Sequence, residues 1–218
     1  MFRANLTPMI SMEVSYMNVK TLFIPTAISA ALCLGLAAPS AQAQEPSFSY
    51  IGGSYIELDE ADTTFDGYEA EISSQLGERW FLSASYAQLS GDWTGGEELD
   101  LDVGYARLGF IVGDAENAAF YLGPQAQYLK ADFGFGSDGE FDIASESETD
   151  YGAFGGVKVM LGDRIELNGE ASWVDMEDEN FTSYSAGVKF FITKNFAATG
   201  EAQFGDLDGF KVGLSYHF

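Results

Sequence analysis

Apolar and polar side chains alternate with period two from residue 47 to the end of this chain. In "YEAEISSQL" (residues 68–76), an apolar or small side chain stands at every second position, with a polar one between. The same alternation runs through "IELNGEASW" (165–173) and "GFKVGLSYHF" (209–218). A period of two places successive side chains on opposite faces of a β-strand, whereas a helix repeats every 3.6 residues. The sequence therefore predicts an all-β protein made of amphipathic strands.

The connections between these strands alternate in length. One set is tight, as in "GER" (77–79), and the other is longer and acidic, as in "GFGSDGEFDIASESET" (134–149). This alternation is typical of an up-and-down antiparallel meander, which can close into a barrel and so remove its edge strands. An even number of strands brings both ends of the chain to the side of the short turns. Ten strands fit the pattern, and an eight-stranded barrel is the alternative. We expect ten strands: 47–58, 66–76, 80–90, 99–112, 118–132, 150–161, 165–174, 183–193, 196–204 and 209–218.

The start of the chain has the pattern of a secretory leader. Residues 17–43, "MNVKTLFIPTAISAALCLGLAAPSAQA", carry one lysine, then an apolar stretch, then a small-x-small ending. This pattern predicts a signal peptide cut between Ala43 and Gln44, and residues 1–16 as an upstream extension. A transmembrane anchor is the alternative, but no positive stop-transfer flank follows Ala43. We therefore expect one exported domain, residues 44–218.

Charge and cysteine content narrow the class of protein. The whole chain has a net charge of −24, and residues 1–43 hold two basic residues and one acidic residue, so their removal makes the chain slightly more negative. So acidic a surface repels nucleic acid and anionic head groups unless cations intervene. The one cysteine, Cys33, lies in the leader, so we expect no disulfide in the mature domain. No second apolar run is long enough for a membrane helix.

Alternation alone does not say which face of the barrel is wet. A soluble barrel hides its apolar face inside, whereas a membrane barrel turns that face outward to lipid. Here the polar face is rich in glycine, serine and threonine, which suit a narrow lumen, and the apolar face carries aromatic residues near strand ends. Aromatic belts are typical of lipid-facing barrels. We therefore predict a transmembrane barrel, with a soluble periplasmic ligand-binding barrel as a less favoured alternative.

Charged residues on the polar face alternate in sign between neighbouring strands from Lys158 to Lys211. Buried charges are tolerated when they are paired, so this pattern predicts ion pairs inside the lumen. Solvated cross-strand pairs on a soluble surface are the alternative. We also expect Phe154 and Phe191 to fill the bore. The expected charge network comprises Glu69, Glu71, Arg107, Lys158, Glu166, Glu170, Lys189, Glu201 and Lys211.

The last strand ends the chain on an aromatic residue, with apolar residues at every second position before it. These positions are Phe210, Val212, Leu214, Tyr216 and Phe218. This strand resembles the C-terminal assembly signal of bacterial outer-membrane barrels. With "YIGGSY" (50–55) and "GVKFFITKNFAATGEAQF" (187–204), residues 47–218 resemble the small OmpA-like or opacity-protein-like barrels of the "porin family" group. The resemblance implies a monomer in the outer membrane, surrounded by lipid and lipopolysaccharide and recognised by the barrel-assembly machinery; the best-known members, however, have eight strands.

Catalytic chemistry is not expected. The one histidine, His217, falls at the short-turn end, so we expect no Ser–His arrangement and no barrel hydrolase. The acidic run Asp175, Glu177, Asp178 and Glu179 is a weak candidate for loop-bound calcium or magnesium, but it lacks the spacing of a calcium loop. We expect no other cofactor. The expected role is structural or surface-interacting and adhesin-like, with a plugged lumen and an external partner that the sequence does not identify; a narrow cation-preferring channel is the alternative.

Overall fold

The computed structural model describes residues 45–218, apart from 61–62, 94–96, 116, 136–141 and 177–179. The predicted extension, the signal peptide and its cleavage point between Ala43 and Gln44 lie outside the described residues, and they stay predictions. Within the described part, no helix is long and apolar enough to cross a membrane.

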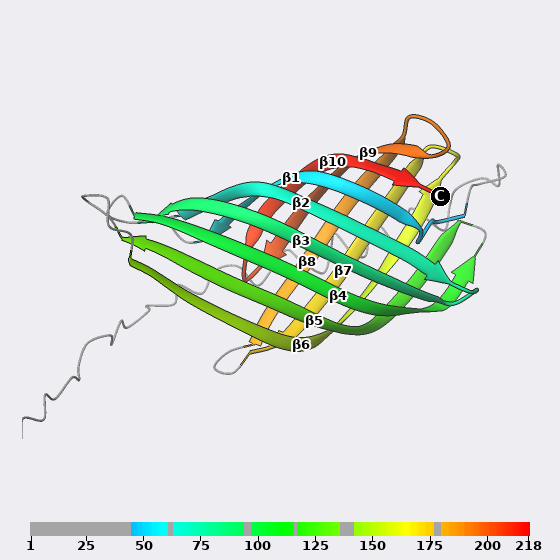
Figure 1. Cartoon of the computed structure of the whole chain (residues 1–218). Coiled ribbons are helices and arrows are strands. Elements are labelled where there is room, and N and C mark those ends of the chain that lie inside the picture. The colour runs from blue at the N-terminus through cyan, green and yellow to red at the C-terminus, as the bar shows by residue number, and fades with distance from the viewer. Residues whose placement is uncertain (1–44, 61–62, 94–96, 116, 136–141, 177–179) are drawn as a thin grey trace, which may run out of the picture.

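The described residues form one closed antiparallel barrel in which each strand pairs with the next and β1 pairs with β10. Figure 1 shows the strands in chain order around this barrel. The prediction of an up-and-down all-β barrel with ten strands is confirmed, and the eight-stranded alternative is wrong. The strands are β1 (Tyr50–Glu60), β2 (Thr63–Leu76), β3 (Trp80–Trp93), β4 (Glu97–Ala115), β5 (Ala118–Phe135), β6 (Asp142–Leu161), β7 (Ile165–Asp175), β8 (Asn180–Phe191), β9 (Phe196–Gly205) and β10 (Asp208–His217).

The two ends of the described chain meet at one end of the barrel, which we call the turn end. Tyr50 at the start of β1 pairs with His217 at the finish of β10. In Figure 1 the start of β1, in blue, and the C-terminus lie together at the right of the view. Two tight turns at this end each contain a glycine with positive φ, 72° at Gly77 and 67° at Gly162. Glycine adopts this conformation without steric cost, because it has no Cβ. We call the opposite end the loop end.

Several strands reach further into the acidic connections than the sequence predicted. The segment 134–149 was expected to be a loop, but β6 begins at Asp142 and β5 continues to Phe135. Residues of the two strands pair throughout this extension, as Lys130 does with Ser147. The described part of this segment is too polar to face lipid. It still forms strand because the outer face of the barrel changes from apolar to polar toward the loop end.

The orientation of apolar side chains inverts along the barrel. On β4 near the turn end, Leu108 points outward and is 40 % exposed, while Arg107 points into the bore. Nearer the loop end of the same strand, Leu99 is buried inside and Asp100 is exposed outside. The outer face is therefore apolar over the turn-end part and polar over the loop-end part. A lipid-facing barrel has the first pattern and a barrel wall in water has the second, so the strands extend beyond the membrane at the loop end.

Two bands of outward-facing aromatic residues border the apolar outer face. Neighbouring strands contribute paired members, such as Tyr55 with Tyr68 and Tyr184 with Phe204. Such bands mark the two membrane–water interfaces of a transmembrane barrel. The loop-end band contains Tyr55, Tyr68, Tyr86, Tyr128, Tyr151, Trp173, Tyr184, Phe204 and Phe210, and the turn-end band contains Trp80, Phe110, Phe120, Phe190, Phe196, Tyr216 and Phe218.

Buried apolar clusters occupy both ends of the bore. Toward the loop end, one cluster gathers side chains from β1 to β4: Ile56, Leu58, Phe65, Ala87, Leu89 and Leu99. Toward the turn end, two further clusters contain Phe48, Phe81, Ile111, Ala119, Tyr121 and Phe154, and Met160, Phe191 and Ala197. Phe154 and Phe191 thus lie inside the barrel, 4 % and 2 % exposed. The polar part of the bore is enclosed between these clusters.

Candidate functional site

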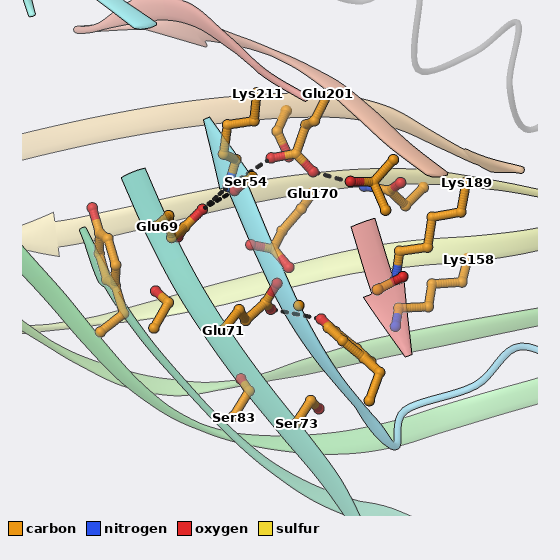
Figure 2. A pocket seen from close by; sticks show the side chains of 18 of the residues that line it. Ser54, Glu69, Glu71, Ser73, Ser83, Lys158, Glu170, Lys189, Glu201 and Lys211 are labelled. Atoms are coloured by element: carbon orange, nitrogen blue, oxygen red, sulfur yellow. Dashed lines mark hydrogen bonds and ion pairs between the residues drawn. The ribbon is translucent and has the colours of Figure 1, made fainter. Parts of the chain in front are cut away.

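A polar cavity of about 170 Å³ occupies the middle of the bore. Serine, threonine and glycine line much of it, and their small side chains leave the space that the long charged side chains enter. Every residue of the predicted charge network lines this cavity except Glu166, which is fully buried beside it. Figure 2 shows the carboxylates and ammonium groups pointing into the same space from different strands.

One ion pair spans the bore. Arg107 on β4 and Glu170 on β7 lie on strands that are not neighbours, yet Arg107 Nη1 is 2.9 Å from Glu170 Oε1. The Tyr121 hydroxyl donates a hydrogen bond of 3.0 Å to the other carboxylate oxygen of Glu170. Both carboxylate oxygens are therefore engaged, and the two side chains form a bar across the lumen.

A second cluster centres on the ammonium group of Lys211. Its Nζ lies 3.1 Å from Glu201 Oε1 on the neighbouring β9 and 3.2 Å from Glu69 Oε2 on β2, which it reaches across β1. Asn168 donates a hydrogen bond of 3.0 Å to Glu201 Oε2. In Figure 2, Lys211 lies between the two carboxylates.

A third cluster lies nearer the turn end. Lys189 Nζ is 3.4 Å from Glu166 Oε1, and these residues are directly opposite each other on β8 and β7. Lys189 also sits 4.2 Å from the centre of the Tyr50 ring, a cation–π contact. The Tyr50 hydroxyl donates a hydrogen bond of 2.6 Å to Glu71 Oε1, which brings that carboxylate into the network.

Lys158 has a different environment from the one expected. The alternation of signs placed it in a salt-bridge ladder with β7, but among the described residues no carboxylate lies within ion-pairing distance of it. Its Nζ instead donates a hydrogen bond of 3.0 Å to the Ser47 carbonyl and lies 4.2 Å from the centre of the Phe48 ring. The ladder prediction is therefore wrong at this position, because the chain before β1 occupies the space beside the ammonium group.

The segment before β1 closes the turn end of the bore. Residues 47–49 were expected to be strand, but β1 begins at Tyr50 and the Phe48 side chain, 2 % exposed, packs inside. Its ring centre is 4.7 Å from that of Phe81 and 5.6 Å from that of Tyr121. Ser73 donates a hydrogen bond of 2.8 Å to the Phe48 carbonyl. The Phe48 side chain therefore plugs this end of the bore. The sequence could have indicated this plug, because Phe48 lies two positions before the inward-facing Tyr50 and positions two apart face the same side.

His217 makes a contact that was not expected. It is 3 % exposed, faces the lumen, and its Nε2 lies 3.0 Å from Ser215 Oγ, two residues earlier on the same face of β10. The prediction that no Ser–His arrangement exists is therefore wrong. Its Nδ1 has no hydrogen-bond partner among the described residues, and its ring packs on Tyr50 and Phe191. A catalytic histidine needs a group that orients it, and this pair has none within the described part of the chain.

The predicted metal candidates are only partly visible. Asp175 is the last residue of β7 and is exposed, whereas Glu177, Asp178 and Glu179 lie outside the described residues. Within the part that is described, no group of three or more histidine, cysteine, aspartate or glutamate residues could hold a metal ion. Loop-bound calcium or magnesium stays a prediction.

A closed antiparallel barrel with an apolar outer face, two aromatic bands and a polar interior defines a transmembrane β-barrel. The chain belongs to the outer membrane protein beta-barrel domain family, whose family model matches residues 28–218. The protein is therefore a β-barrel of the bacterial outer membrane, embedded in lipid. Barrels of this membrane have short periplasmic turns and longer extracellular loops, so the turn end faces the periplasm and the loop end faces the outside.

Comparison with solved structures finds other barrels of low sequence identity. Ail, the attachment invasion locus protein of Yersinia pestis, is 17% identical (TM-score 0.40, 78% of this chain, 95% of that chain). The β domain of the Bordetella autotransporter BrkA is 13% identical (TM-score 0.49, 79% of this chain, 100% of that chain). Neisserial surface protein A is 10% identical (TM-score 0.39, 78% of this chain, 95% of that chain). Similarity at this level identifies neither ligand nor partner. Among curated proteins, no sequence matched.

Proposed function

We propose that this protein is a monomeric, non-conducting barrel with a structural or surface-interaction role. The observation that carries the proposal is the closure of the bore. The bar formed by Arg107 and Glu170 crosses its middle, and buried apolar clusters lie toward both ends. Paired charges that span the lumen oppose the passage of ions, because an ion would have to displace them.

The outer part of the barrel supports a role at the surface. Beyond the loop-end aromatic band, β4 presents Asp100 and Asp102 outward, and Ser90 and Gln88 of β3 hydrogen-bond to them. This wall stands clear of the lipid and is acidic, so it is accessible to a partner and repels nucleic acid. An adhesin-like contact through this wall is the form of surface interaction we favour.

Planar-bilayer recording tests the closed bore. We expect the purified barrel to give no steady single-channel steps at any voltage at which a wide outer-membrane porin, reconstituted in the same way, conducts. Steady steps from the wild-type protein would contradict the proposal. They would favour the alternative of a narrow cation-preferring channel, for which the polar cavity of about 170 Å³ is the supporting observation. A reversal potential in a potassium chloride gradient would then give its ion preference.

We propose no enzymatic activity. Ser215 and His217 are 4 % and 3 % exposed, so a substrate cannot reach them without opening the turn end of the barrel. Their contact fits a packing role better, since the imidazole ring is held between Tyr50 and Phe191.

We also propose that the last strand is recognised during assembly. Phe210, Val212, Leu214, Tyr216 and Phe218 all point outward and are exposed to lipid, and the Phe218 amide donates a hydrogen bond of 3.2 Å to the Ser49 carbonyl. The strand therefore forms one side of the seam that closes the barrel. Recognition of these side chains before the seam closes would leave the other nine strands free to pair.

Replacing Phe218 with alanine is expected to reduce the amount of folded barrel in the outer membrane several-fold, because the assembly machinery would lose the terminal aromatic. The measurement is the heat-modifiable band on a gel of fractionated membranes. Phe196→Ala is the matched control, since Phe196 is an outward-facing aromatic of the same band with 51 % exposure and lies outside the last strand. Equal losses in the two variants would show a general effect of lipid-facing aromatics and contradict the proposal.

A further inference from the structure

One side of β6 has no neighbouring strand at the loop end. On its other side, β6 pairs with β5 as far as Asp142, its first residue (Figure 1). Its pairing with β7 stops at Tyr151, which is opposite Asp175, the last residue of β7. Tyr151 belongs to the loop-end aromatic band, so residues 142–150 lie on the aqueous side of that band. We call the side of residues 142–149 that faces away from β5 the open edge of β6.

The direction of the backbone groups determines which residues can bond along this edge. In an antiparallel strand, successive residues point their N–H and C=O groups to opposite sides. The Met160 amide donates to the Asn117 carbonyl beside β5, so even-numbered residues of β6 face β5 and odd-numbered residues face the other side. Past Tyr151, the residues whose backbone groups point along the open edge, with no described residue paired to them, are Ile143, Ser145, Ser147 and Thr149.

The connection from β7 to β8 is too short to cover this edge. Asp175 and Asn180 pair with each other, so residues 176–179 only join two paired ends. A connection of this length extends about two residues past its ends, which is about 7 Å along a neighbouring strand. Ser147 lies about 13 Å past Tyr151 at the rise of a strand, and it is exposed. The open edge from Ser147 outward is therefore accessible to another molecule.

The composition of the open edge indicates what can pair with it. An exposed strand edge is a template for another strand, and many proteins protect such edges with lysine or proline. The segment "DIASESETD" (142–150) contains no lysine, arginine or proline, and its charged residues are all acidic. The basic residue opposite Ser147 on β5, Lys130, forms an ion pair with Asp132 and leaves this sign unchanged. A second copy of the edge would place like charges opposite one another, whereas a basic strand matches it in hydrogen bonding and in charge.

We propose that the open edge of β6 binds an extended basic segment of a partner protein, which adds to the barrel wall as one more strand. The backbone groups of Ile143, Ser145 and Ser147 supply the hydrogen bonds, and the acidic sequence of this part of β6 favours lysine and arginine in the partner. This contact is separate from the adhesin-like contact through the outer wall of β3 and β4. It rests on the position of the loop end outside the cell and does not depend on the closure of the bore.

The probe is a dye-labelled peptide of four Lys-Val repeats, and fluorescence anisotropy measures its binding to the barrel in phosphatidylcholine nanodiscs. This lipid has no net charge, so it does not attract the peptide by itself. We expect wild type to bind the peptide and Ser147→Pro to bind it at least about tenfold more weakly, because proline removes an N–H of the open edge. That N–H points away from β5, so the variant loses no hydrogen bond within the barrel. Ser147→Ala is the matched control, since it keeps the N–H and should bind like wild type.

Further controls separate strand pairing from simple charge attraction. The same peptide with every backbone nitrogen methylated keeps its charge but cannot donate along a strand edge, so it should bind at least about tenfold more weakly. Asp102→Asn removes an outward acid of β4 and should bind the peptide like wild type. Heat-modifiable migration should show that all three variants fold.

Four results would overturn the proposal. Two are no binding by wild type, and equal binding of the methylated and unmethylated peptides. The third is a loss of binding in Asp102→Asn but not in Ser147→Pro, which would assign the contact to the wall of β3 and β4 and leave the proposed surface role standing. The fourth is a wild-type dimer in analytical ultracentrifugation that Ser147→Pro abolishes, which would make a second copy the occupant of the edge.

Discussion

Replacing Glu166 with glutamine is expected to lower the free energy of unfolding by about 3–5 kcal/mol. Glu166 is fully buried, and its carboxylate lies 3.4 Å from the ammonium group of Lys189. Glutamine keeps the shape of the side chain but leaves Lys189 charged and without its counter-ion. Urea unfolding of the barrel in lipid vesicles, followed by tryptophan fluorescence, measures the loss.

The matched variants distinguish a charge effect from general damage. Glu78→Gln removes the same charge from an exposed position in the turn between β2 and β3, and it should leave the unfolding midpoint unchanged. Glu166→Gln combined with Lys189→Met removes both partners and should recover most of the loss, because no uncompensated charge remains in that pair. A double variant as unstable as Glu166→Gln alone would show that the pair does not act through its charges.

Replacing Phe48 with alanine is expected to cost about 3–5 kcal/mol, the usual loss for a buried phenylalanine. The ring packs against Phe81 and Tyr121 and supports the ammonium group of Lys158. The variant should also open the turn end of the bore to water, because the plug is the side chain itself. Urea unfolding measures the first effect.

A cysteine placed at Ser83, which lines the cavity, measures the second effect. We expect a water-soluble maleimide to label Ser83→Cys slowly in the wild-type background and much faster with Phe48→Ala. Phe48→Leu is the control: it keeps most of the volume, should cost less than about 1.5 kcal/mol and should leave labelling slow. Equal labelling in all three backgrounds would show that Phe48 does not seal the bore.

Strand number, strand order and the choice of lipid-facing side could be predicted from the sequence because each depends on local pattern. In 209–218, period two puts Lys211 and Phe210 on opposite faces. The small and charged residues of one face and the aromatic residues of the other then assign Lys211 to the bore and Phe210 to the lipid. The extent of β6 could not be predicted in this way. Its polar residues 142–149 lack the apolar face of a membrane strand, and they form strand because β5 supplies a continuous backbone partner.

The identity of charge partners was decided by the tertiary structure. The sequence placed Arg107 and Glu170 on the same side of their strands, but their contact at 2.9 Å depends on the diameter and stagger of the closed barrel. Lys158 shows the same limit, since its neighbours include Ser47, which is 111 positions away in the chain.

By itself, the sequence determined which side chains face lipid and which face the bore, because in a β-strand that choice follows from whether a position is odd or even. Only the tertiary structure decided which of the inward groups meet, that Phe48 fills the turn end, and that β6 continues to Asp142 beyond its pair with Asp175 at the end of β7. The physical reason is that contacts across a bore, plugs and strand lengths are set by how ten strands close on one another, and no stretch of the chain carries that information alone.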